Sequence, residues 1–87
     1  MFVNEVSAIY DIVEMKDLFD RYDFAVRLKE ARLHRGLSMK EVAERVGVTA
    51  SAVAYYESGE RVPRLPVLGK LASEFSVTID HLVGRAF

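Results

Sequence analysis

The chain has 87 residues, of which 51% are hydrophobic and 29% are charged, and its formal net charge is −1. This length allows one domain of ordinary globular composition, and the absence of cysteine excludes disulfides and thiolate-ligated metal sites. No apolar run approaches the about 18 residues of a membrane span, and the N-terminus lacks the basic and apolar pattern of a signal peptide, so we expect a cytoplasmic protein.

An acidic and apolar extension, residues 1–22, precedes a basic domain, residues 23–87. Through Asp23 there are six acidic and two basic residues, a formal charge of −4, and the remainder has ten basic and seven acidic residues, a charge of +3. The extension has two apolar stripes at helical spacing, namely Val6, Ile9, Tyr10 and Val13, and Ile12, Met15, Phe19 and Tyr22. We expect a helix here, and a strand at residues 2–6 is the alternative. A polyanion responds to the local charge, so the basic domain remains compatible with DNA.

Short helices then follow one another with little chain between them. The first runs from about Asp23 to Arg35, where Gly36 ends it. The second opens at Ser38, and Glu41 completes a capping box, in which each side chain accepts a hydrogen bond from the backbone N–H of the other residue.

Three more helices complete the domain. The third opens at Thr49, a favourable N-cap, and ends at Ser58. Residues 60–66 form a loop into the fourth helix, and a last short helix begins at Thr78 and ends before Gly84. The pattern therefore predicts an all-α domain of five helices.

Ala43, Gly47 and Val53 form the most specific pattern in the chain. Two helices cross at roughly 90 to 120° over a tight turn when a small residue lies at the crossing, a glycine at the break and an apolar residue after it. Ala43 meets the first condition, Gly47 can adopt the positive φ of a helix C-terminus, and Val53 supplies the apolar contact. This spacing predicts a helix-turn-helix.

Residues 24–84 resemble the lambda-repressor and Cro-like helix-turn-helix family, also called the XRE family. The resemblance is carried by LKEARLHRGLS, KEVAERVGVT, YYESGERVP and LGKLASEFSVTIDHLVG, and it covers about 60 of the 87 residues. Members are five-helix DNA-binding domains, mostly transcriptional repressors and antitoxins of bacteria and phages. The resemblance implies that Glu57 pairs with Arg32 of the first helix. It also shows a departure at Met39, where the family usually has a glutamine that anchors the helix to DNA.

The third helix, residues 49–58, is expected to lie in the major groove of double-stranded DNA. Its base-contacting residues would be Thr49, Ala50, Ser51, Ala54 and Tyr55, and the phosphate-contacting residues would be Ser38, Met39, Lys40, Arg61 and Arg64. The helix has no Arg, Lys, Asn or Gln, the side chains that discriminate bases best, so we expect modest affinity, a preference for A·T-containing sites and dependence on dimerisation.

The surface expected to bind a second copy or a partner protein is apolar. It comprises Val6, Ile9, Tyr10, Val13, Phe19, Val26 and Leu33, of which the last two lie seven residues apart on the first helix. The function hypothesis is a homodimeric, sequence-specific DNA-binding regulator, expected to be a repressor. The alternative is an antitoxin-like or protein-interaction module that kept the fold with weak or no DNA binding.

Enzyme chemistry is not expected from this sequence. His34 and His81 lie on different helices without a nucleophile or clustered carboxylates, and no phosphate-binding glycine loop or metal-ligand spacing is present. We therefore expect no cofactor and no metal.

Overall fold

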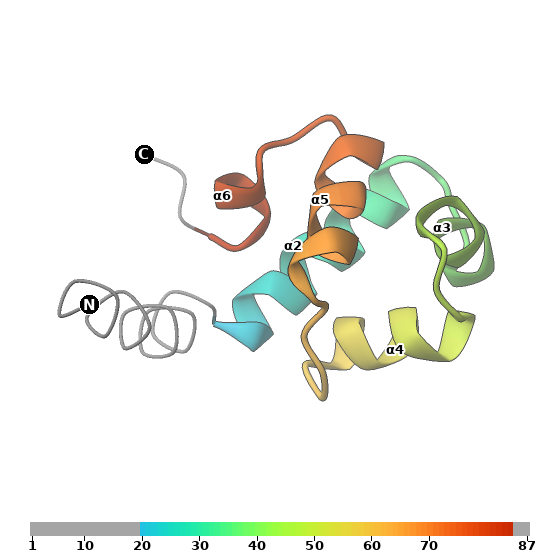
Figure 1. The fold of residues 1–87 in the computed structure, drawn as a ribbon, viewed down its shortest axis with the longest axis horizontal. Helices are drawn as coiled ribbons and strands as arrows, with labels where there is room; N and C mark the ends of the chain where they lie inside the picture. The colour runs from blue at the N-terminus through green and yellow to red at the C-terminus, as the bar shows by residue number, and fades with distance from the viewer. Residues whose placement is uncertain (1–19, 85–87) are drawn as a thin grey trace, which may run out of the picture.

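The computed structural model describes residues 20–84, which form five α-helices and, within this range, no strand (Figure 1). The helices are α2 (Arg21–His34), α3 (Met39–Val46), α4 (Ala50–Ser58), α5 (Leu65–Glu74) and α6 (Ile79–Leu82). The expected all-α, five-helix fold is confirmed. The predicted extension helix, its alternative strand at residues 2–6, and Val6, Ile9, Tyr10, Val13 and Phe19 lie outside the described residues.

Helix α2 begins two residues before the predicted start at Asp23. The Asp20 carboxylate accepts hydrogen bonds from the backbone N–H groups of Tyr22 and Asp23, at 2.9 and 3.2 Å, and so caps the helix. An aspartate at this position satisfies N–H groups that have no partner within the helix. The expected boundary between extension and domain therefore falls inside the first turn of α2.

The turn between α3 and α4 has the geometry that the Ala43, Gly47, Val53 pattern predicts. Gly47 ends α3 with φ of +77°, and the backbone N–H groups of Gly47 and Val48 both donate to the Ala43 carbonyl, at 2.9 and 3.0 Å. Thr49 then caps α4 by accepting a hydrogen bond from the backbone N–H of Ala52 at 3.0 Å. The two helices are thus joined without a flexible linker.

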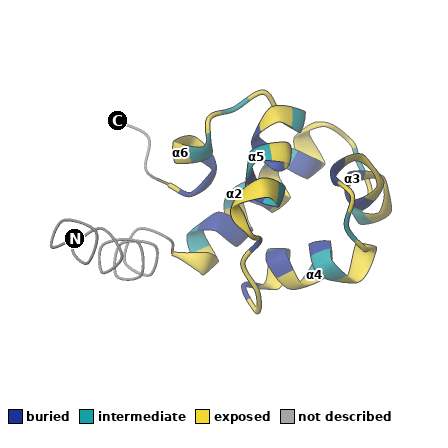
Figure 2. Cartoon of the chain, viewed as in Figure 1, coloured by how far each residue is buried: buried dark blue, intermediate teal, exposed yellow. Residues whose placement is uncertain are grey.

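One apolar cluster holds the helices together. Its largest fully buried side chains are Phe24, Leu28, Val42, Val46, Val53, Leu71 and Leu82. Helix α2 packs on α4 and α6, and α3 packs on α4 and α5, so α4 lies along one edge of the domain with one side left open (Figures 1 and 2). None of the described helices is long and apolar enough to cross a membrane.

Candidate nucleic-acid interface

Helix α4 has a buried side and an exposed side. Val53 and Tyr56 are buried in the core, at 0% and 8% exposure. The exposed side carries the five residues predicted to contact bases: Thr49, Ala50 and Ser51 are exposed, Ala54 is half-buried, and Tyr55 is 37% exposed. These residues share one surface, and all but Tyr55 have small side chains that leave the backbone accessible.

Hydrogen-bond donors gather at the N-terminus of α4. The Thr49 hydroxyl accepts the N–H of Ala52, so its own hydrogen remains available to an outside acceptor. The N–H groups of Ala50 and Ser51 belong to the first turn, where no helical carbonyl precedes them. This end of α4 therefore suits a phosphate or the acceptor atoms of a base.

The predicted capping box at the start of α3 is present and uses two of its hydrogen-bond donors. Ser38 N–H donates to the Glu41 carboxylate at 2.9 Å, and Glu41 N–H donates to the Ser38 hydroxyl at 3.0 Å. The hydrogen bond that the Ser38 backbone N–H donates to the carboxylate is the main cause that lowers the pKa of Glu41 below its ordinary value, so the carboxylate stays charged. The N–H groups of Met39 and Lys40 belong to the first turn and remain available to an anion.

Met39 itself cannot bind phosphate through its side chain. The side chain is half-buried and packs against the core, so its backbone N–H is the only donor that it offers. The three basic residues predicted beside the reading surface, Lys40, Arg61 and Arg64, are all exposed. Among residues 20–84, none of them forms an ion pair, and their charges are therefore free for a polyanion.

Tyr55 and Arg61 form a contact that the sequence analysis missed. The Arg61 guanidinium carbon lies 4.6 Å from the centroid of the Tyr55 ring, in a cation–π geometry. An arginine six residues after an aromatic is no signal by itself, because the contact depends on the path of the loop between them.

Glu57 is turned away from the exposed side of α4 and pairs with Arg32 of α2. Arg32 Nε donates to Glu57 at 2.6 Å and Nη2 at 3.0 Å, and Nη1 donates to the Leu37 carbonyl at 2.9 Å. The two side chains are only 10% and 3% exposed. The hydrogen bonds to Glu57 raise the pKa of Arg32. The pair that the resemblance implies is therefore present, and it removes the one carboxylate of α4 from the exposed side of the helix.

The exposed side of α2 carries an apolar stripe. Val26 and Leu33, predicted as partner residues, are 55% and 57% exposed, and Tyr22 on the same side is 62% exposed. Large apolar side chains grouped in this way are typical of protein-interaction surfaces.

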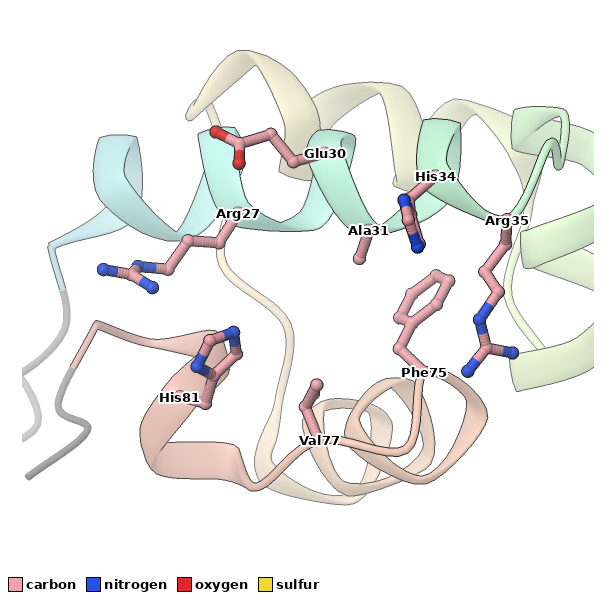
Figure 3. Close-up of a pocket in the computed structure, with 8 residues that line it drawn as sticks. All are labelled: Arg27, Glu30, Ala31, His34, Arg35, Phe75, Val77 and His81. Atoms are coloured by element: carbon pink, nitrogen blue, oxygen red, sulfur yellow. The ribbon is translucent and has the colours of Figure 1, made fainter.

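A groove lies between α2 and the segment from the end of α5 to α6 (Figure 3). It brings together His34 and His81, which the sequence analysis treated as unrelated, around an apolar floor that includes Phe75. Its arginines have partners within the protein: Arg27 pairs with Asp23 at 3.2 Å, and Arg35 donates to the Glu74 carbonyl at 3.4 Å. No residue of α3 or α4 lines this groove, so it is separate from the candidate interface. Within residues 20–84, no group of three metal-ligating side chains is found.

Comparisons with known proteins agree with this geometry. A family model described as Helix-turn-helix, HTH_3, matches residues 28–82. The chain is 42% identical over 59 residues to the HTH-type transcriptional regulator AnsR of Bacillus subtilis, covering 68% of this chain and 51% of AnsR. It is 35% identical over 60 residues to the cryptic phage CTXphi transcriptional repressor RstR of Vibrio cholerae, covering 69% of this chain and 54% of RstR. The chain thus spans about half the length of these curated relatives.

A solved structure shares both the fold and part of the sequence. It is that of Bacillus thuringiensis PlcR in complex with the peptide PapR7 and DNA, with a TM-score of 0.66 and 28% identity, covering 70% of this chain and 21% of PlcR. The family model covers more than half of the chain, and the relatives described above are transcriptional regulators and not enzymes. The resemblance drawn from the sequence is therefore confirmed, and the chain belongs to the HTH_3 family of XRE- and Cro-type helix-turn-helix domains.

Proposed function

We propose that this chain is a sequence-specific DNA-binding transcriptional regulator that represses its targets as a homodimer, with α4 in the major groove. The observation that carries the proposal is the exposed side of α4, where small side chains and free donors are flanked along the chain by basic residues that form no ion pair within residues 20–84. The relatives are regulators by name, and the PlcR structure contains DNA. Because a regulator of this kind works where the DNA is, the proposal includes a cytoplasmic location.

Base reading would come from the first turns of α4. The Thr49 and Ser51 hydroxyls would bond to base acceptors or donors, and the methyl groups of Ala50 and Ala54 would pack on thymine methyls. Lys40 and Arg64, together with the N-termini of α3 and α4, would hold the phosphates on either side. Because these contacts are individually weak, two copies on adjacent half-sites would supply the affinity.

The test is selection of duplexes from a random pool by the full chain, followed by fluorescence anisotropy across a salt series. We expect an enriched sequence and a log–log salt slope of several units, since each neutralised phosphate contributes about 0.9. Arg64→Ala should lower the slope, whereas Arg27→Ala, on the groove away from α4, should not. A flat salt response with no enriched sequence would contradict the regulator function.

The apolar stripe of Tyr22, Val26 and Leu33 favours a second candidate, a module that binds a protein partner, in the manner of an antitoxin. The same stripe would serve the proposed homodimer. Sedimentation equilibrium separates these uses: a dimer dissociated by Leu33→Glu but not by Lys70→Glu, on the exposed side of α5, supports homodimerisation through this stripe. A monomer at high micromolar concentration contradicts it.

A further inference from the structure

Helix α4 has no basic side chain of its own, yet a guanidinium lies on its exposed side. Arg61, from the loop that follows the helix, stacks on Tyr55 with 4.6 Å between the guanidinium carbon and the ring centroid. The negative face of the ring attracts the cation, and the contact also restricts the rotamers of a long side chain. The exposed side of α4 therefore carries a positive charge that its own nine residues do not contain.

The backbone of the loop is fixed to the same tyrosine. The Tyr55 carbonyl accepts hydrogen bonds from the N–H of Glu60 at 3.0 Å and from the N–H of Arg61 at 3.2 Å. Arg61 is thus joined to Tyr55 through its main chain as well as its side chain, which places its Cα in a defined position beside the ring.

Two buried residues anchor the loop to the domain. Gly59, with φ of +80°, is buried under the ring of Tyr22 from α2, so close that a Cβ on Gly59 would lie 2.6 Å from Tyr22 Cδ1. Pro63 is buried on the other side of Arg61. An exposed arginine between two buried anchors has a pre-organised position, which lowers the entropy cost of binding a ligand.

The charge of Arg61 is available to an outside anion. The nearby carboxylates are engaged, since Glu57 pairs with Arg32 and Glu60 accepts a hydrogen bond from Ser58 at 3.1 Å. No carboxylate among residues 20–84 lies within ion-pair distance of Arg61. Stacking occupies one face of the guanidinium and leaves its in-plane N–H groups free, the arrangement that binds phosphate oxygens in pairs.

We propose that Tyr55 is a positioning residue that holds the Arg61 guanidinium against a DNA phosphate, and that it adds affinity without sequence preference. This inference rests on the DNA-binding function proposed above and revises the role of Tyr55, which the sequence predicts to contact bases. The phosphate rather than a base is the partner because Arg61 lies beyond the C-terminal end of α4, whereas such helices read bases with their N-terminal residues.

The test is a double-mutant cycle in the full chain with a duplex of about 20 base pairs, two turns of DNA, in an anisotropy salt series. Arg61→Ala should weaken binding about tenfold and lower the log–log salt slope by about 0.9 for each bound copy. Tyr55→Leu should weaken binding about threefold, to a similar extent on two duplexes of different sequence. The double variant should bind no more weakly than Arg61→Ala alone.

The conservative variant Tyr55→Phe is the matched control. It keeps the ring and removes only the hydroxyl, so wild-type affinity is expected, and thermal unfolding should show that every variant remains folded at the assay temperature. Additive losses in the cycle, or a Tyr55→Phe variant as weak as Tyr55→Leu, would overturn the positioning role. A wild-type chain that binds no duplex would overturn the regulator function as well, so the two failures are distinguishable.

Discussion

The two sides of α4 differ in burial and in how many of their side chains have partners within the described residues. On the inner side, Val53 and Tyr56 fill the core, and Glu57 has both carboxylate oxygens bound to Arg32. On the outer side, Thr49 makes a capping hydrogen bond, while Ala50 and Ser51 have no side-chain partner among the described residues. The inner side therefore specifies the fold, and the outer side, proposed above to read DNA, is free to change without loss of the fold. Three substitutions, from the largest expected effect on stability to the smallest, test this division.

Glu57→Ala on the inner side should lower the free energy of unfolding by about 3 kcal/mol or more, because it leaves the Arg32 charge buried without a partner. Urea unfolding measures the loss, which is large against the about 5 to 15 kcal/mol of a typical domain. Glu74→Ala is the control, since the Arg45–Glu74 pair at 2.7 Å is more exposed and should contribute less than about 1 kcal/mol. Equal losses of unfolding free energy from Glu57→Ala and Glu74→Ala would contradict a larger contribution from the buried Arg32–Glu57 pair.

Gly59→Ala, at the junction between the two sides, should cost about 2 kcal/mol. A Cβ makes the positive φ unfavourable by about 1 kcal/mol and also displaces the Tyr22 ring. Gly36→Ala is the matched control, with φ of +67° and no atom within 4 Å of the added Cβ. It should therefore lose only the about 1 kcal/mol that the positive φ costs a residue with a Cβ. If thermal unfolding shows the same loss for both, Tyr22 does not hold the turn.

Ser51→Ala on the outer side should change the free energy of unfolding by less than about 0.5 kcal/mol, since the side chain is exposed and makes no hydrogen bond within the described residues. It should reduce discrimination at one base pair of a selected duplex by about 1 kcal/mol. Anisotropy with single-base variants of that duplex measures this, with the exposed Ser73→Ala on α5 as the control. A marked loss of stability would contradict the division between the two sides.

Most of the fold could be predicted because its determinants are local. The caps at Ser38 and Thr49 and the glycine at Gly47 are read directly from neighbouring residues, and the structure has all three. The start of α2 was predicted two residues late, since Asp20 and Asp23 both suit a helix N-terminus and only the observed hydrogen bonds identify Asp20 as the cap.

Tertiary contacts account for what the sequence could not show at the candidate site. The Tyr55–Arg61 stack depends on a loop held down by Tyr22, which lies 37 positions before Gly59 in the chain. The groove that joins His34 and His81 depends on the packing of α6 against α2.

The inward position of Glu57 has a consequence for how selectivity and salt are related. It is the only charged residue of α4, so in the proposed complex the helix would present no formal charge of its own to the bases, and the cations proposed to meet phosphates lie on flanking segments. Ionic strength acts on the phosphate contacts, which are common to every sequence. The ratio of affinities for two duplexes should therefore stay nearly constant as salt rises, while both affinities fall together.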